Sequence, residues 1–155
     1  MDDFYLAPPA FFFGLSFGTD GGSLDGSFQE VSGLEVELEV EDVIEGGNNS
    51  FKHRLPVRTS YRNLTLKRGL VTEEKYTILT EWVKNNLLSE TNLDEPIETR
   101  DLTVSLFNAG GEIVMSWNVY GAYPVKWSVS NFNAQESALS IETLELAFRE
   151  FKVAT

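Results

Sequence analysis

The chain has 155 residues, of which 24 are acidic, 12 are lysine or arginine, one is histidine and none is cysteine. This length fits one ordinary domain, residues 1–155, and no apolar run approaches the ~20 residues of a membrane span. The missing cysteines exclude a disulfide framework, a thiol nucleophile and a cysteine-ligated metal, and the single His53 excludes a multi-histidine metal site within one chain.

The net charge of −12 bears on partners and location. An acidic chain repels nucleic acids and anionic membranes on average, so we expect neither direct nucleic-acid binding nor a membrane anchor. Asp2 and Asp3 stand where a secretory signal has basic residues. We therefore expect the protein to be made and folded in the cytoplasm.

Apolar residues alternate with period two in the first part of the chain, which is typical of β-strands. A first strand is predicted over 11–17, and a loop rich in glycine and serine over 19–27. The clearest signal is an alternation of aliphatic residues with glutamates: Leu34, Val36, Leu38 and Val40 with Glu35, Glu37, Glu39 and Glu41. It predicts a half-buried antiparallel strand, with its aliphatic face in the core and its carboxylates in solvent.

The middle of the chain predicts two strands and one helix. A turn over 45–49 precedes the strands, which are expected over 51–55 and 61–67 with Pro56 between them. Residues 72–88 then change to a helical period. The residues of its apolar stripe are Tyr76, Leu79, Val83 and Leu87, with Trp82 beside them as a core residue.

The last third begins after a polar loop predicted over 89–100. It predicts four strands, over 102–106, 113–120, 125–129 and 137–151. The first two are joined by a hairpin turn at 108–111, and Pro124 separates the second from the third. In the last strand the apolar phase slips by one residue, which predicts a β-bulge near Glu142 or Thr143.

The sum is about seven or eight strands and one helix. Such a chain favours a single antiparallel β-barrel or sandwich with the helix flanking it. A flat open sheet of this size would leave edges that aggregate, so we expect closure of the sheet or pairing of its edges with a neighbouring chain.

Charge is segregated along the sequence. Residues 30–45 contain seven acids and no base, whereas residues 51–72 contain six of the twelve lysines and arginines, His53 and no acid. One interpretation is that the two segments pair as adjacent strands within one chain. The other is that the acidic segment of one chain meets the basic segment of the next, a head-to-tail contact that builds rings or stacks. Composition does not choose between them.

No constellation of residues predicts catalysis. His53 lies between Lys52 and Arg54, whose like charges disfavour its protonated form, so a structural or interface role is expected. The alternating glutamates could supply paired carboxylates for glycoside hydrolysis, but a solvated strand face explains them. Asp20 and Asp25 lack the spacing of a calcium loop. We expect no catalytic residue, no metal, no cofactor and no enzymatic activity.

A series of short motifs runs through the chain in a characteristic order. The motifs are Phe28–Leu34, Glu45–Asn48, His53–Pro56, Leu64–Gly69, Ala122–Trp127 and Ile141–Leu146. From about Tyr5 to Phe151, the series resembles the tail tube family of contractile phages and extracellular contractile injection systems. The resemblance implies a structural subunit whose hexameric rings stack into a hollow tube for payload delivery, inside a contractile sheath.

The same resemblance implies partners, and together with the segregated charges it leads to hypotheses about contact and lumen residues. The expected partners are the chain itself, the sheath protein, baseplate and cap proteins, and a protein payload, in a phage tail-like particle that can be released outside the cell. The candidates for contacts between subunits are Glu45, Gly46, Gly47, Asn48, Lys52, His53, Arg54 and Arg58. The candidates for an acidic lumen wall are Glu35, Glu37 and Glu39.

Three alternatives stay open at this stage. A secreted tube protein of the type VI system would have the same architecture in another setting. A monomeric β-barrel could bind a small apolar ligand among its aromatic residues. A hydrolase would need two carboxyl groups with separated pKa values in one cleft, which the sequence does not show.

Overall fold

The computed structural model describes residues 11–18, 24, 26–43, 53–69, 78–88, 97–130 and 141–154. The strands are β1 Phe12–Phe17, β2 Gly26–Phe28, β3 Glu30–Ser32, β4 Val36–Val43, β5 His53–Tyr61, β6 Leu64–Gly69, β7 Arg100–Phe107, β8 Ile113–Val129, β9 Ile141–Ala147 and β10 Glu150–Ala154. The helical segment is α1 Ile78–Val83, continued by a π-helical turn, η2 Lys84–Leu88. Among these residues no helix has the length and apolar character needed to cross a membrane.

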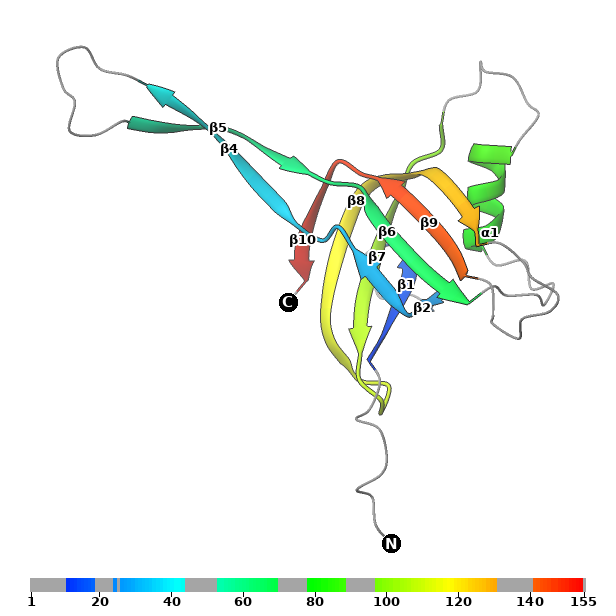
Figure 1. Cartoon of the computed structure of the whole chain (residues 1–155). Helices are drawn as coiled ribbons and strands as arrows, with labels where there is room; N and C mark the ends of the chain where they lie inside the picture. Colours follow the sequence, from blue (N-terminus) through cyan, green and yellow to red (C-terminus); the bar gives the residue numbers. More distant parts are fainter. Residues whose placement is uncertain are drawn as a thin grey trace, which may run out of the picture.

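Eight strands form one strongly curved antiparallel sheet, the body of the subunit (Figure 1). The strand order is β2-β1-β7-β8-β9-β6-β3, and β10 pairs with β8. Both end strands belong to the segment 26–32, since β2 pairs with β1 and β3 pairs with β6. In the described residues no ladder joins β2 to β3, so the sheet is not a closed barrel. The predicted mainly-β, antiparallel, sandwich-like fold is confirmed.

The core lies on the concave face of this sheet, where period-two alternation places aliphatic residues opposite one another. Leu102 lies opposite Val119, and Leu64 lies opposite Leu146. All four side chains are fully buried. Burying each such side chain contributes roughly 1.5–3 kcal/mol, which makes these pairs the main source of stability of the body.

The helical segment lies at one side of the body and closes the core there (Figure 1). Leu79, Trp82 and Val83 are buried, as the apolar stripe predicts. The Trp82 indole donates a hydrogen bond from Nε1 to the carbonyl oxygen of Glu98 at 2.9 Å and meets the Phe17 ring edge-to-face. The described helix covers 78–88 of the predicted 72–88, and the residues before Ile78 lie outside the described part.

A two-stranded arm, β4 and β5, projects away from the body (Figure 1). The alternation from Val36 to Val40 correctly predicts a strand, but the prediction that its aliphatic face is buried is wrong. Leu38 is 54% exposed, and seven of the eight residues of β4 are exposed. Alternation reports a strand with two unlike faces, and it does not say which surface covers the apolar one.

Three predicted boundaries are wrong, and two involve proline. Pro56 lies inside β5 and Pro124 inside β8, which is one continuous strand of 17 residues. Proline is tolerated in strands at open edges and bulges, and each of these lies beside a register shift. The predicted last strand is two strands, because the chain turns at Phe148 and Arg149 before β10.

The predicted bulge near Thr143 is also wrong. The ladder between β6 and β9 is regular from Ile141 to Leu146, and the register shift lies on β8 between Pro124 and Lys126. The apolar residues Ile141 and Leu144 lie on opposite faces of one regular strand, Ile141 exposed and Leu144 buried. The strand's first residue is therefore apolar but lies outside the core.

Replacing Gly33 by alanine is expected to destabilise the subunit by more than the ~1–2 kcal/mol of a left-handed backbone alone. Gly33 has φ +95°, and a Cβ there would collide with the carbonyl oxygen of Asn63. Gly111→Ala is the matched control, because Gly111 has φ +81° and open space around it. Urea unfolding of the two variants gives the comparison. Equal losses would show that the backbone at Asn63 moves aside.

Candidate assembly surfaces

The arm has two unlike faces, which follow from its register. Residues directly opposite each other in an antiparallel pair share a face. The apolar arm face consists of Val36, Leu38 and Val40 with Tyr61, Thr59 and Pro56. The charged arm face consists of Glu37, Glu39 and Glu41 with Ser60, Arg58 and Leu55.

A β-bulge sets this arrangement. The register shifts between Glu39 and Val40, so that Val57 has no directly opposite partner and Pro56 lies opposite Val40. Beyond the bulge the alternation of β5 changes side, and Leu55 joins the charged face instead of the apolar one. Val57 and Leu55 are 57% and 53% exposed. The arm therefore presents apolar side chains to solvent on both faces in its outer half.

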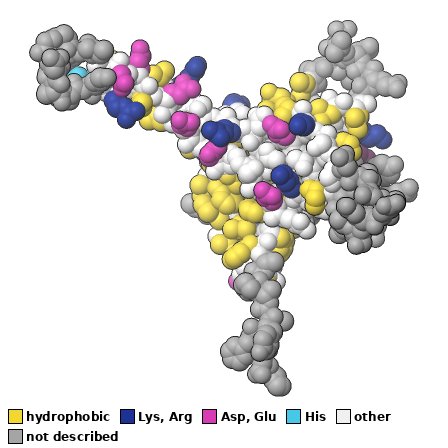
Figure 2. Space-filling view, viewed as in Figure 1, with side chains coloured by type: hydrophobic (Ala, Val, Ile, Leu, Met, Phe, Trp, Pro, Cys, Tyr) yellow, Lys and Arg dark blue, Asp and Glu magenta, His cyan; other side chains and the backbone are white. Residues whose placement is uncertain are grey.

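Ion pairs join the strands of the arm within the chain. The Arg58 Nε donates a hydrogen bond to Glu39 Oε2 at 2.7 Å, which raises the pKa of Arg58 through the hydrogen bond and the charge of Glu39. Arg62 lies 3.1 Å from Glu35, and the third pair is Arg54 with Asp42. Pairing of the acidic and basic segments within one chain is thus confirmed. Figure 2 shows both charges alternating with hydrophobic side chains along the arm.

A further ion pair lies between β6 and β9 and is largely buried. Arg68 Nε donates to Glu142 Oε2 at 2.9 Å, with the two side chains only 11% and 14% exposed. The Trp127 indole donates to the other carboxylate oxygen of Glu142 at 2.8 Å. The carboxylate is therefore held by two donors from different strands.

Removing the buried arginine is expected to cost far more stability than removing an exposed one. Arg68→Met leaves the Glu142 carboxylate in a site largely shielded from water, a loss of about 3–5 kcal/mol. Arg58→Met breaks a pair whose side chains are 75% and 43% exposed, so water screens the pair and the loss is expected to be much smaller. Urea unfolding at pH 7 measures both. Similar losses would contradict the difference in burial between the two pairs.

A second exposed apolar surface lies at the end of the body near the β7–β8 turn. Met115, Trp117 and Val119 share one face of β8, and Val119 is fully buried in the core. The same face continues past the core to Met115, which is 39% exposed, and Val153 of β10, opposite Trp117, is 51% exposed. A register shift between Leu106 and Phe107 then leaves Val114 without a directly opposite partner, and Ile113, 62% exposed, lies opposite Phe107 on the other face. Figure 2 shows hydrophobic side chains gathered over this part of the body, the hairpin patch. Its residues are Ile113, Val114, Met115 and Val153.

The predicted contact residues fall into two groups. Glu45, Gly46, Gly47, Asn48 and Lys52 lie outside the described residues. His53, Arg54 and Arg58 lie exposed on β5, and of the lumen candidates Glu37 and Glu39 lie on β4, with Glu35 just before it. Asp20 and Asp25 also lie outside the described part, within which no three acidic or histidine side chains gather to hold a metal.

Sequence reasoning missed the apolar surfaces. The alternation predicts that the aliphatic residues of β4 lie in the core, and the pattern of residues 113–120 predicts an ordinary return strand. A signal was present in the second case, since three consecutive apolar residues put a large side chain on both faces. Such a run predicts a strand that is covered on both sides or that meets a partner.

A family model covers nearly the whole chain. A family model described as T4-like virus tail tube protein gp19 matches residues 9–152. The chain belongs to this tail tube family. It is therefore a structural tail tube protein. The comparison with curated protein sequences gave no match.

Solved structures show the same fold for this tail tube chain. A chain in the anti-feeding prophage baseplate is 24% identical, with 99% of this chain and 97% of that chain covered and a TM-score of 0.72. A chain in the sheath–tube complex of an extracellular contractile injection system, PVC, in the extended state, is 24% identical, with 97% and 93% covered and a TM-score of 0.70. A type six secretion system protein, at 11% identity, covers 93% and 83% with a TM-score of 0.58.

Proposed function

We propose that this chain is the subunit of the inner tube of a contractile injection system, in which hexameric rings stack into a hollow tube inside a contractile sheath. Membership of the tail tube family supports this assignment. The likeness in fold to chains of the anti-feeding prophage baseplate and of the PVC sheath–tube complex favours a phage tail-like particle over a phage tail. A tube of the type VI kind has the same fold and stays the alternative.

The observation that carries this proposal is the arm. A two-stranded hairpin is marginally stable in water, and this one leaves apolar side chains exposed along its length. Exposed apolar area of this kind marks an interaction surface. The arm and the hairpin patch lie on different parts of the body, so contacts between copies are heterologous, the kind that closes into rings or propagates as stacks.

The sheet edges support ring formation. In the described part of the chain β10 pairs only with β8, which leaves its second edge open to a neighbouring subunit. The arm contributes contacts between subunits through Arg54, Arg58 and His53, together with Glu45, Gly46, Gly47, Asn48 and Lys52 from outside the described part. Edge pairing joins the sheets of neighbouring subunits around the ring, and the arm adds contacts beyond it.

The remaining assignments follow from the tube. The sheath, baseplate and cap proteins are its partners, and a protein payload passes through its lumen. The chain acts as structure and conduit and catalyses no reaction. An acidic wall including Glu35, Glu37 and Glu39 would repel anionic cargo, although Glu35 and Glu39 are each paired with an arginine of the arm. The particle is made in the cytoplasm and acts outside the cell.

The test is electron microscopy of the purified chain together with charge reversal on the arm. Wild type is expected to form six-fold rings or stacked tubes. Arg54→Glu/Arg58→Glu is expected to reduce tube formation. It removes two ion pairs and makes the net charge of the arm more negative by four units. Circular dichroism checks that the body stays folded.

A charge swap separates the two interpretations of these arginines. The variant Asp42→Arg/Glu39→Arg/Arg54→Glu/Arg58→Glu restores both pairs within the hairpin. If the arginines also contact a neighbouring subunit, the swap leaves assembly impaired. Assembly of the swap at the wild-type level would limit their role to the hairpin. Absence of rings and tubes for the wild type, even with a baseplate as nucleus, would overturn the proposed function.

A further inference from the structure

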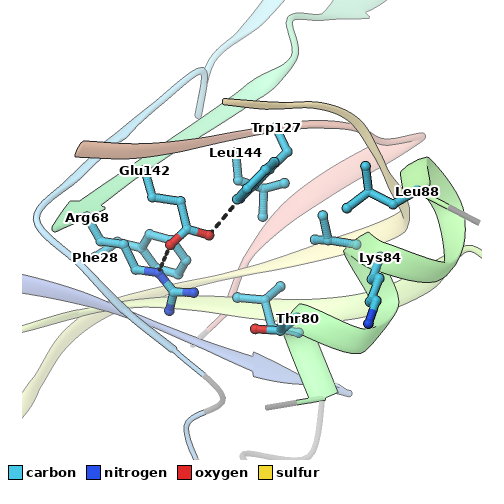
Figure 3. Close-up of a pocket in the computed structure, with 10 residues that line it drawn as sticks. Phe28, Arg68, Thr80, Lys84, Leu88, Trp127, Glu142 and Leu144 are labelled. Atoms are coloured by element: carbon cyan, nitrogen blue, oxygen red, sulfur yellow. Dashed lines mark hydrogen bonds and ion pairs between the residues drawn. The ribbon is translucent and has the colours of Figure 1, made fainter. Parts of the chain in front are cut away.

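A pocket lies between the helical segment and the sheet (Figure 3). Its walls are apolar: Phe28 and Leu144 come from the sheet, and Leu79, Val83 and Leu88 from α1 and η2. Figure 3 shows Trp127 above Leu144, with Thr80, Lys84 and Leu88 on the helical side. The Arg68–Glu142–Trp127 network forms one end of the pocket.

Hydrogen bonds hold the walls of the pocket in place on both sides. Glu142 is held by hydrogen bonds from two strands. On the other side, the Asn86 side chain donates to the carbonyl oxygen of Trp82 and accepts from the backbone N–H of Glu98, which ties the π-helical turn to the segment before β7. A π-helical turn is a strained element that is frequently found at functional sites.

The size and lining of the pocket define the chemical class of its occupant. The volume is about 150 Å³. An apolar cavity of this volume, lined by aliphatic and aromatic side chains, is known to take one benzene ring. The exposed Lys84 lies at the rim of the pocket. Its positive charge favours an occupant that has an acidic residue next to its aromatic ring. The pocket therefore fits one aromatic side chain that has a carboxylate close by in sequence.

The N-terminal segment of the chain has this composition. Residues 1–10 lie outside the described part, and Asp2-Asp3 directly precede Phe4-Tyr5. We propose that the pocket takes the ring of Phe4 or Tyr5 from a second copy of this chain. The proposal rests on the proposed tube and deepens it, because it assigns one contact between stacked or neighbouring subunits.

The course of β1 favours a second copy over the same chain. Phe12 lies opposite Phe107 beside the β7–β8 turn, whereas Phe17 at the other end of β1 contacts Trp82 of α1. The described chain thus begins about 17 Å or more from the helical segment. A head-to-tail contact joins unlike surfaces of two copies. The proposal takes these surfaces to be the end where the chain begins on one copy and the helical end of the next. Phe4 lies seven residues before Phe11, a reach of at most ~23–25 Å. To enter the pocket of its own chain the segment would have to turn back along β1, whereas a copy facing that end is reached without a reversal.

Cysteine crosslinking of the full-length chain tests the proposal. The chain has no cysteine, so the variant Asp3→Cys/Lys84→Cys offers a single pair, and a disulfide requires Cα atoms within about 7 Å. Under mild oxidation we expect a ladder of covalent oligomers on a denaturing gel without reductant. Asp3→Cys/Arg149→Cys is the control, because Arg149 is exposed and far from the pocket lining.

Further substitutions in the crosslinking variant test whether the crosslink depends on insertion of a ring into the pocket or only on the two cysteines being close. Thr80→Phe fills the pocket from its rim and is expected to lower the oligomer yield at least about tenfold, as is Phe4→Leu/Tyr5→Leu. Asn85→Phe adds the same ring to an exposed position outside the pocket lining and is expected to leave the yield unchanged.

The outcomes separate this proposal from the proposed function. Tubes that form without the oligomer ladder overturn the pocket assignment and leave the tube standing. A crosslink confined to single chains overturns the second copy as the occupant. Equal ladders from the Thr80→Phe and Asn85→Phe variants overturn the role of the pocket. Absence of both tubes and ladder overturns both proposals.

Discussion

Replacing Leu38 by aspartate is expected to abolish tube formation while the subunit stays folded. Leu38 lies in the middle of the apolar arm face and is 54% exposed, so it contributes little to the core of its own chain. In the proposed tube a partner covers this face, and burial of a leucine there would contribute roughly 1.5–3 kcal/mol per contact. Aspartate loses that contribution and places a charge in an apolar interface. Sedimentation velocity and electron microscopy measure the loss of assembly.

The matched control is Ser60→Asp, which adds the same charge to the same hairpin on the opposite, charged face. It is expected to lower assembly by much less than Leu38→Asp. Thermal unfolding of both variants checks that the body is intact. If both variants assembled as wild type does, the apolar arm face would not be an interface. If both failed equally, total charge rather than the apolar face would control assembly.

Trp82→Ala is expected to be strongly destabilising, with a loss of about 3–5 kcal/mol of the free energy of unfolding. The indole is 1% exposed, packs edge-to-face on Phe17 and donates its N–H to the carbonyl oxygen of Glu98. Its removal opens a cavity between the helical segment and the sheet and leaves that carbonyl without the indole donor. In a chain of this size the loss corresponds to a fall in Tm of roughly 6–20 °C.

Two controls locate the cause of this loss. Trp82→Phe keeps most of the packing and loses the hydrogen bond, so its cost is expected to stay near that of one hydrogen bond, about 0.5–1.5 kcal/mol. Trp117→Ala removes an indole that is only half-buried and should cost less than Trp82→Ala. A loss from Trp82→Ala no larger than that from Trp117→Ala would contradict the central place of Trp82 in the core.

The sequence predicts the secondary structure of the body well because local periodicity and burial agree there. The alternation of Leu102 with Val104 and of Leu144 with Leu146 places each of these residues in the core. The apolar stripe of the helix likewise predicts the burial of Leu79 and Val83. These side chains are covered by their own chain, so a local pattern suffices.

The local pattern does not predict burial in the arm, because the described part of the chain does not cover the apolar arm face. The pattern from Val36 to Val40 is the strongest in the sequence, yet these residues are exposed. Period two reports that one face of a strand avoids water, and another subunit satisfies that requirement as well as a core does. A regular amphipathic strand therefore predicts a partner surface without identifying the partner.

The sequence also does not predict where the strands that contain proline begin and end. Pro56 and Pro124 separate strands in a sequence-based prediction, whereas both lie within strands in the structure. Whether a proline ends a strand depends on whether its position needs a donor, which is decided by the neighbouring strand. The bends on β8 and β5 likewise depend on register, which a single sequence does not contain. The pocket depends on packing between segments distant in sequence, such as Phe28 and Leu144.

The projecting arm also bears on the order of events in assembly. Backbone hydrogen bonds in an isolated two-stranded hairpin open at low free energy, so in the free subunit the amides of β4 and β5 exchange with solvent much faster than those of β8. In the proposed tube, docking on a neighbouring subunit orders the arm, and that ordering costs conformational entropy at each encounter. A growing tube end presents the complete acceptor surface at once, whereas two free subunits must order together. Elongation from an existing end is therefore favoured over spontaneous nucleation, and a preformed template determines where tubes begin.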